Sequence, residues 1–150
     1  MNLSSEQVSV VLPALLLMGV TFVAWFAMYI ERIGEMRRER IHPQAVATRN
    51  LSRGKLQRTR AADNFSNLLE LPVLFYALTA LVLVLDVRSA IFAPLAMAYV
   101  GLRVLHSAIH ISYNRVMHRF YVYVASSLVL MAMWLVVLVQ VLGARGGIDG

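Results

Sequence analysis

The stretch RVLHSAIHISYNRVMHRFYVY, residues 103–123, decides how this chain folds. It begins inside an apolar run long enough to cross a bilayer, yet that run carries Arg103, His106 and His110. Their spacing of three and four residues places these side chains on one stripe of a helix. A cation at the centre of a membrane span costs about 2.5–3.5 kcal/mol, so it is expected to face a bundle interior or a polar cavity. The rest of the chain should therefore supply partners for this stripe.

The composition is that of an integral membrane protein. Of the 150 residues, 59% are hydrophobic and 15% are charged, and the mean hydropathy is +0.67. A soluble domain is typically about 45–50% apolar and about 25% charged. Cysteine is absent, which excludes disulfides, catalysis by a cysteine thiolate and cysteine metal sites. The net charge of +6 lies mostly in loops beside apolar runs, which argues against a nucleic-acid partner.

Four apolar segments predict four transmembrane helices in a single domain that spans residues 1–150. The expected spans are residues 8–30, 65–85, 90–113 and 119–142. A signal peptide is a poor interpretation of the first span, because no basic segment precedes it and no small-residue cleavage site follows it. The helix of the second span should begin near Lys55 to Arg60, since no helix breaker intervenes before Pro72.

Basic residues predict the orientation of the four spans. The positive-inside rule places the charged loop at residues 31–60 in the cytoplasm, and both termini are then outside. The short turn at residues 114–118 is expected on the inner side, and Arg88 and Arg145 on the outer side. The predicted fold is therefore an all-α integral membrane four-helix bundle. Nine of the fourteen basic residues lie in the charged loop: Arg32, Arg37, Arg38, Arg40, Arg49, Arg53, Lys55, Arg58 and Arg60.

Polar side chains of the last three spans are expected at similar depths. A helix rises 1.5 Å per residue, which places Arg103 and Glu70 about 20 and 22 Å from the outer ends of their spans. We therefore expect these two side chains to form an ion pair. On each helix the polar residues share a face, and together they predict a cytoplasm-facing pocket for a small hydrophilic anion beside a lipid-accessible surface. The face residues are Arg60, Asp63, Asn64, Asn67 and Glu70 on the second span, and Arg119, Tyr123 and Ser126 on the fourth.

Simpler interpretations exist for individual residues of this pocket. Glu70 and Arg103 taken alone could form a structural ion pair that fixes the helix register. Tyr123 taken alone could be an aromatic residue at the membrane interface. His106 and His110 could bind a metal or haem only with a further strong ligand, so we predict no metal site. The joint occurrence of the polar stripes favours a functional pocket.

At these residues the chain resembles the MAPEG superfamily, the membrane-associated proteins of eicosanoid and glutathione metabolism. Arg103-Val104-Leu105-His106 matches a motif of that family in register, and Arg115, Arg119 and Tyr123 follow at the family's spacings. In the second span, Asn67 and Glu70 followed by Pro72 resemble another family motif. Asn64 is an alternative for the motif asparagine, because Arg60 precedes it by four residues as in the family. The resemblance is to a bacterial-type member, similar to microsomal prostaglandin E synthases and glutathione transferases.

The resemblance implies a homotrimer that holds glutathione between protomers in the bilayer. Arg119 would stabilise the glutathione thiolate, with Tyr123 beside it, and a lipophilic electrophile or hydroperoxide would arrive from the membrane. The chain would then be a membrane-embedded glutathione-dependent transferase or peroxidase, in a bacterial inner membrane with its pocket facing the cytoplasm. By the same resemblance, glutathione would be bound by Arg60, Asn64, Asn67, Glu70, Arg103, His106, His110 and Arg115.

Two positions depart from the family pattern. His110 stands where the family has tyrosine, and Asp63 stands where it has arginine if Asn67 and Glu70 are the motif pair. Asp63 favours the alternative function, a non-catalytic member that binds a lipid or a partner protein. Retention of Arg119 and Tyr123 favours the enzyme.

Overall fold

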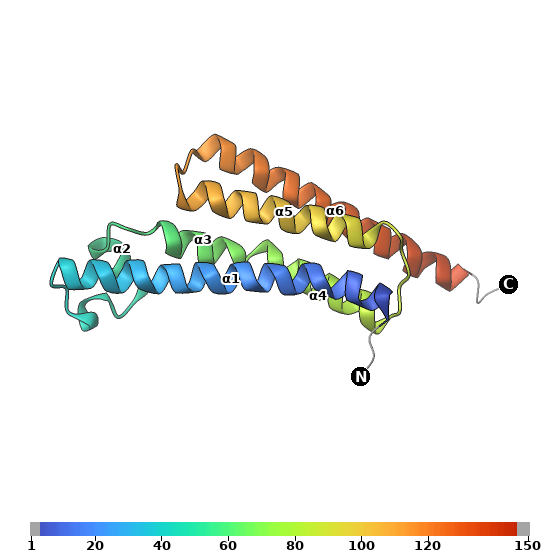
Figure 1. The fold of residues 1–150 in the computed structure, drawn as a ribbon, viewed down its shortest axis with the longest axis horizontal. Coiled ribbons are helices and arrows are strands. Elements are labelled where there is room, and N and C mark those ends of the chain that lie inside the picture. The colour runs from blue at the N-terminus through green and yellow to red at the C-terminus, as the bar shows by residue number, and fades with distance from the viewer. Residues whose placement is uncertain (1–3, 147–150) are drawn as a thin grey trace.

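The structure, a computed structural model, describes residues 4–146, without the side chains at positions 49, 53, 145 and 146. The described chain is helical throughout its regular structure and contains no β-strand (Figure 1). The predicted all-α bundle with four membrane-spanning segments is confirmed. The side chains of Arg49 and Arg53, expected in the charged loop, and of Arg145, expected on the outer side, lie outside the described part. The four segments long and apolar enough to cross a membrane are Ser5–Arg38, Arg60–Val84, Phe92–Ile111 and Val116–Ala144.

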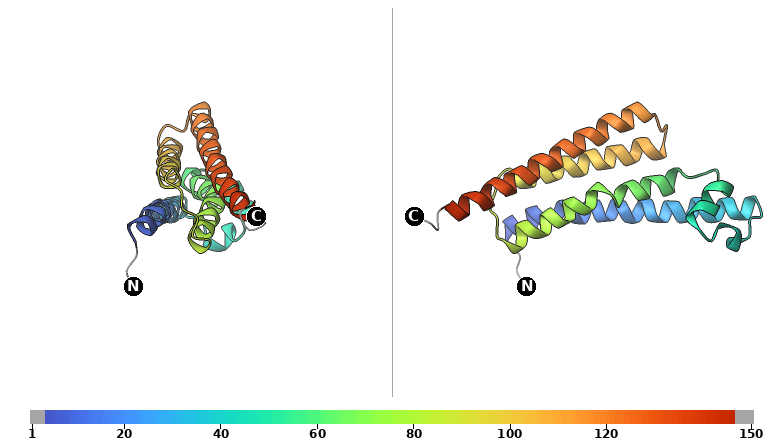
Figure 2. Two further views of the ribbon diagram at one scale, coloured as in Figure 1. Left: turned by 90° about the vertical axis from the view of Figure 1, so that its right-hand side faces the viewer. Right: turned by 180° about the vertical axis from the view of Figure 1, so that it is seen from behind.

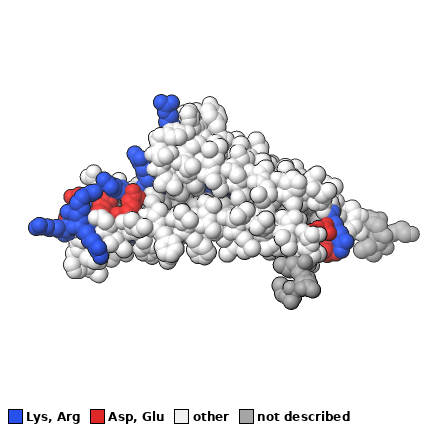
Figure 3. All heavy atoms as spheres, in the orientation of Figure 1, with Lys and Arg blue, Asp and Glu red and all other residues white. Residues whose placement is uncertain are grey.

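The helices form two layers along one long axis. The helix α1 (Ser5–Arg38) runs beside α3 (Arg60–Leu68) and α4 (Leu71–Val84), while α5 (Phe92–Ile111) and α6 (Val116–Gly146) form a hairpin above them (Figures 1 and 2). Both ends of the described chain lie at one end of the bundle. Lysine and arginine side chains gather mainly at the opposite end (Figure 3). This distribution is the one that the positive-inside rule requires of a bundle with an even number of spans.

The core lies where α1, α4, α5 and α6 meet. Leu17, Phe75, Tyr99 and Met133 are fully buried there, and the rings of Phe75 and Tyr99 have their centroids 4.8 Å apart. Many other large apolar side chains are exposed on the outside of the bundle; Val84, for example, is 80% exposed. Exposed apolar surface on this scale is expected of helices whose solvent is lipid rather than water.

The first helix is longer than the sequence suggested. It begins with a capping box, in which the Ser4 hydroxyl accepts from the Gln7 amide and the Gln7 side chain accepts from the Ser4 amide. At its other end it continues through the charged residues to Arg38, so the loop begins at Glu39 rather than at the predicted Glu31. Residues 31–38 contain no proline, and their only glycine is a tolerable cost within a long helix.

Three side chains on this extension hold the connection to α3 in place. Glu35 is buried, and its carboxylate accepts hydrogen bonds from the backbone amides of Gln57 at 2.8 Å and Arg58 at 3.1 Å. Glu31 accepts from the amide of Ala61 at 3.0 Å, and Arg32 donates to the hydroxyl of Ser52. The connection carries a short 3-10 helix, η1 (Pro43–Val46), and the helix α2 (Arg49–Lys55).

The second span is broken, contrary to the predicted continuous helix. Its first part begins at Arg60, at the edge of the predicted start, and α3 ends at Leu68. Pro72 lies in the first turn of α4, where its missing N–H and fixed φ are tolerated. In a continuous helix the proline ring would clash with the carbonyl of Leu68, so the chain stops and restarts instead. Glu70 becomes the residue that precedes α4, with φ −90° and ψ −100°.

The Glu35 carboxylate should contribute measurably to stability. Glu35→Ala leaves two backbone amides without their acceptor, and we expect it to lower the free energy of unfolding in detergent by about 2 kcal/mol. Thermal unfolding measures the loss, and faster proteolysis between residues 47 and 60 would locate it.

Glu39→Ala is the matched control, since the Glu39 side chain forms an exposed ion pair with Arg38. Such pairs contribute about 0–1 kcal/mol, so this variant should stay close to wild type. Equal stability of Glu35→Ala and Glu39→Ala would contradict the assigned role of Glu35.

Candidate functional site

The predicted stripe on α5 points into the protein. Arg103, His106 and His110 are buried, with exposed fractions of 0%, 2% and 2%. Tyr99 lies on the same stripe one turn away and is also fully buried. The 3.6-residue period of the helix therefore places one cation and two imidazoles in the interior of a membrane bundle.

Arg103 is held by backbone and by an aromatic ring. Its Nη2 donates to the backbone carbonyl of Asn67, in the last turn of α3, and its guanidinium carbon lies 5.6 Å from the ring centroid of Tyr123. The C-terminus of a helix carries partial negative charge, and an aromatic face attracts a cation at this distance. Two of its nitrogen atoms, Nε and Nη1, are buried and have no hydrogen-bond partner in the described chain.

The two histidines extend this polar interior toward the basic end of the bundle. The ring centroid of His106 lies 5.9 Å from that of Tyr123 on α6 and 5.9 Å from that of His110. The Nδ1 atoms of both histidines are buried and unpartnered within residues 4–146. No group of three His, Asp or Glu side chains that could hold a metal ion occurs in the described part of the chain.

The two candidate asparagines of α3 have different surroundings. Asn64 is 1% exposed, and its side-chain oxygen is buried without a partner among the described residues. Asn67 is half-buried and donates from Nδ2 to the backbone carbonyl of Asp63 at 3.0 Å. Asn64 therefore has the side-chain acceptor available in the interior, whereas Asn67 contributes its backbone carbonyl.

The predicted ion pair between Glu70 and Arg103 is wrong for the described chain. Within residues 4–146, the ion pairs join Arg38 to Glu39 and Arg88 to Asp86, and Glu70 is exposed. The break after Leu68 is the physical reason, because depth counting assumed an uninterrupted helix with Glu70 on its inner face. Arg103 instead meets Asn67, three residues earlier in the chain.

The remaining predicted cations lie around the basic end of the site. Arg60 is exposed and donates from Nη1 to the carbonyl of Ser112, which ties α3 to the end of α5. Arg119 lies in the first turn of α6, half-buried, and donates from Nη1 to the side-chain oxygen of Asn114 at 2.8 Å. Arg115 is exposed. The structure thus gathers Arg103, His106, His110, Asn64 and Tyr123 in the interior, with Arg60 and Arg119 nearer its basic end.

Sequence reasoning missed Asn114. This residue has φ of +48°, a left-handed conformation that asparagine tolerates better than most residues, and its side chain holds Arg119. An asparagine between two helical segments was the available signal, and it was interpreted only as part of a turn. A cavity of about 570 Å³ lies beside it, lined also by Glu31, Arg58, Arg60 and Ile111.

An apolar groove of about 490 Å³ runs between α4 and α6. Leu71 and Leu74 line it from α4, and Ser127 and Trp134 line it from α6. The hydroxyls of Ser126 and Ser127 both donate to the carbonyl of Tyr123, so one end of the groove lies next to the polar interior. The polar interior and the apolar groove therefore lie next to each other near Tyr123.

Comparison with known proteins identifies the family of this chain. No curated protein and no solved structure matches the chain. The model of the MAPEG family matches residues 10–139, which include most of each of the four spans and every polar residue of the site. This chain, an integral membrane bundle with a buried arginine and histidine stripe, belongs to the MAPEG family.

Proposed function

We propose that this MAPEG protein is a membrane-embedded glutathione-dependent transferase or peroxidase that acts on lipophilic electrophiles or hydroperoxides. The observation that carries the proposal is the buried Arg103, whose Nε and Nη1 atoms have no hydrogen-bond partner among residues 4–146 and lie beside Tyr123 and His106. A donor without an acceptor inside a membrane protein costs several kcal/mol of free energy, so these donors are best explained as groups that bind a ligand.

The unpartnered groups fit the chemistry of glutathione. This tripeptide carries two carboxylates, an amine and amides, and a guanidinium can bind a carboxylate with two parallel hydrogen bonds. Arg103 would supply that fork, and Asn64 would accept from an amide or amine of the ligand. His106 and His110 would add imidazole nitrogens, and Arg60 a second cation near the basic end. Asn67, Glu70 and Arg115 complete the proposed binding set.

Arg119 and Tyr123 would carry the chemistry on α6. A cation beside a thiol favours the thiolate, which is the nucleophilic form. Arg119 would hold that thiolate, and the hydroxyl of the half-buried Tyr123, one turn deeper, would donate a hydrogen bond to it. The thiolate sulfur then forms a bond to an electrophilic carbon, and the leaving group departs with the bonding electron pair.

The groove between α4 and α6 would present the second substrate. Its lining is almost entirely apolar, and Ser127 at its edge is bonded to the backbone of Tyr123. A lipophilic molecule in this groove would reach the sulfur from the bilayer without crossing water.

A neighbouring copy would complete the site. Glu70 and Arg115 are exposed in the single chain, and both belong to the proposed binding set. The family suggests a homotrimer in which protomers share the glutathione site. The basic end of the bundle would face the cytoplasm, in the inner membrane of a bacterium.

Arg119 should be essential for turnover. Arg119→Ala is expected to lower kcat for conjugation of a model electrophile by about 10²- to 10³-fold, because the sulfur then reacts without the preorganised positive charge beside it. Arg119→Lys should retain part of the activity, since a point charge replaces the planar fork.

The control for this series is Arg88→Ala, which removes an exposed arginine from the opposite end of the bundle. It should keep wild-type turnover and trimer mass. If Arg119→Ala turns over as wild type, Arg119 does not stabilise the reacting thiolate. If wild type shows no glutathione-dependent activity, the non-catalytic lipid- or partner-binding function takes the place of the enzyme.

Asn114 should act by positioning Arg119. Asn114→Gly keeps a residue that tolerates the positive φ but removes the acceptor for Arg119. We expect kcat to fall about tenfold, because a misplaced charge stabilises the thiolate less well. KM for glutathione and the melting temperature should stay near wild type. Unchanged kcat would show that Arg119 does not depend on Asn114.

Arg103 should be needed for glutathione binding. Arg103→Lys keeps one donor for the carbonyl of Asn67 but loses the planar fork that holds the two unpartnered N–H groups. Calorimetry should show glutathione affinity reduced by about tenfold or more, whereas Arg88→Lys should bind as wild type. Wild-type affinity of Arg103→Lys would remove Arg103 from the binding set.

A further inference from the structure

His110 and Asp63, which depart from the family pattern, lie at the same end of the bundle. His110 is in the last turn of α5, and Asp63 is in the first turn of α3, which packs against α5. The guanidinium of Arg60 donates to the carbonyl of Ser112 at 3.1 Å, which holds the first turn of α3 beside the end of α5. Asp63 follows Arg60 by one helical turn and His110 precedes Ser112 by two residues, so the same contact brings their side chains to one region of the site.

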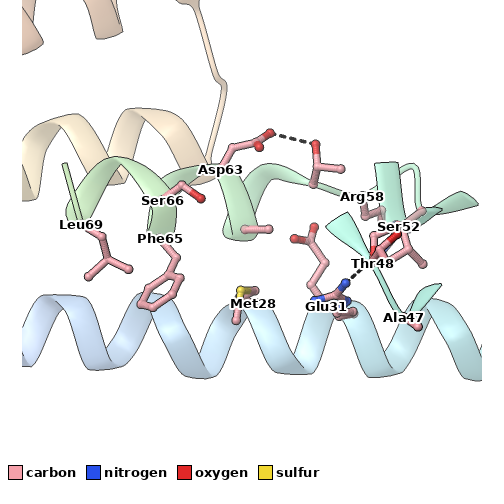
Figure 4. A pocket seen from close by; sticks show the side chains of 14 residues that line it. Met28, Glu31, Ala47, Thr48, Ser52, Arg58, Asp63, Phe65, Ser66 and Leu69 are labelled. Carbon is pink, nitrogen blue, oxygen red and sulfur yellow. Dashed lines mark hydrogen bonds between the residues drawn. The ribbon is translucent and has the colours of Figure 1, made fainter. Parts of the chain in front are cut away.

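The carboxylate of Asp63 lies on the side of α3 away from α1. Asp63 is among the residues that line a pocket of about 410 Å³ between α1 and α3, but its carboxylate lies on the other side of the helix (Figure 4). There it accepts a hydrogen bond from the hydroxyl of Thr59 at 2.9 Å. It acts electrostatically on His110, and its exposure also keeps it in contact with solvent.

The imidazole of His110 is part of the polar interior. Its side chain is 2% exposed, and its Nδ1 atom is buried without a hydrogen-bond partner in the described chain. Its ring lies 5.9 Å from that of His106, which lies 5.9 Å from the ring of Tyr123. His110 is the histidine nearer the basic end of the bundle, where α6 begins. The proposed glutathione site therefore contains an imidazole whose hydrogen-bonding capacity the protein does not use.

Charges of both signs surround this imidazole. Arg119 of α6 and Arg60 of α3 act on His110 as cations, and Asp63 of α3 acts on it as an anion. A proton that moves from a thiol to His110 leaves a negative charge beside Arg119 and creates a positive charge beside Asp63. Each new charge then interacts with an opposite charge that is already in place, so the transfer needs little rearrangement of the site.

We propose that His110 is the general base that takes the proton of the glutathione thiol, and that Asp63 stabilises the imidazolium that forms. This inference rests on the glutathione-dependent function proposed above. The S–H bond breaks, an N–H bond forms on the imidazole, and the electron pair stays on the sulfur beside Arg119. After the sulfur has bonded to the electrophile, the imidazolium gives its proton to the leaving group, and the neutral base is restored. Asp63 is a positioning residue, because it acts through His110.

The pH dependence of turnover tests the role of His110. His110→Gln keeps a polar side chain but cannot take a proton, so kcat at pH 7 and saturating glutathione should fall by about 10²-fold. Above the ordinary thiol pKa of about 8.5 the thiol ionises without a base. The kcat of the variant should therefore approach that of wild type at high pH. His42→Gln removes an exposed imidazole from the connection before α2 and should keep the wild-type profile.

A structural role for His110 would give a different profile. A loss in kcat that is equal at every pH, or wild-type kcat of His110→Gln at pH 7, would overturn the proposal. Absence of glutathione-dependent turnover in wild type would overturn the proposed function together with this inference. Active wild type with a pH-independent loss in His110→Gln would overturn the inference alone.

A double-mutant cycle tests the role of Asp63, an exposed residue whose substitution should leave the fold intact. Asp63→Asn should lower kcat at pH 7 about tenfold in the wild-type background and leave it unchanged in the His110→Gln background. Its loss in the wild-type background should also disappear at high pH, which tests the pair even if His110→Gln does not fold. Asp86→Asn removes an exposed carboxylate between α4 and α5 and should have no effect in either background. Equal losses from Asp63→Asn in both backgrounds, or no loss in the wild-type background, would show that Asp63 does not act through His110.

Discussion

The contact between the Arg103 guanidinium and the backbone carbonyl of Asn67 is the interaction on which the rest of the bundle depends. A buried cation must be compensated, and no carboxylate within residues 4–146 forms an ion pair with Arg103. The compensation comes from the C-terminal end of α3 and from the ring of Tyr123. One side chain on α5 thereby fixes the position of the second span and of α6.

The break in the second span makes this contact possible. A carbonyl inside a continuous helix is already bonded to the amide four residues later, so it has little capacity for another strong donor. Because the helix breaks after Leu68, the carbonyl of Asn67 accepts a long hydrogen bond from the Glu70 amide, at 3.4 Å, and it also accepts from Arg103. The break before Pro72 thus provides the partner that the buried arginine needs.

Much of the fold and part of the site could be predicted from the sequence. Apolar runs of membrane length give the four spans, and the 3.6-residue period places Arg103, His106 and His110 on one buried face because those spans are regular helices. The face of Glu70 could not be predicted, since it depends on how the backbone turns at the break. The burial of Glu35 could not be predicted either. A carboxylate within a basic segment is usually solvated, and only the path of the returning chain brings the amides of residues 57 and 58 to it.

The charges at the basic end of the bundle therefore have two different physical roles. Glu31 and Glu35 bind backbone amides and determine the path of the connection. Arg58 is exposed, and Arg119 uses Nη1 to donate to Asn114, so both arginines keep N–H groups that can bind a ligand. Inside the bundle the same reasoning applies to Arg103, with one N–H group bonded to the protein and two unpartnered atoms remaining. A membrane interior offers little water to satisfy such atoms, so the structural contact fixes the guanidinium while its remaining N–H groups are kept for binding.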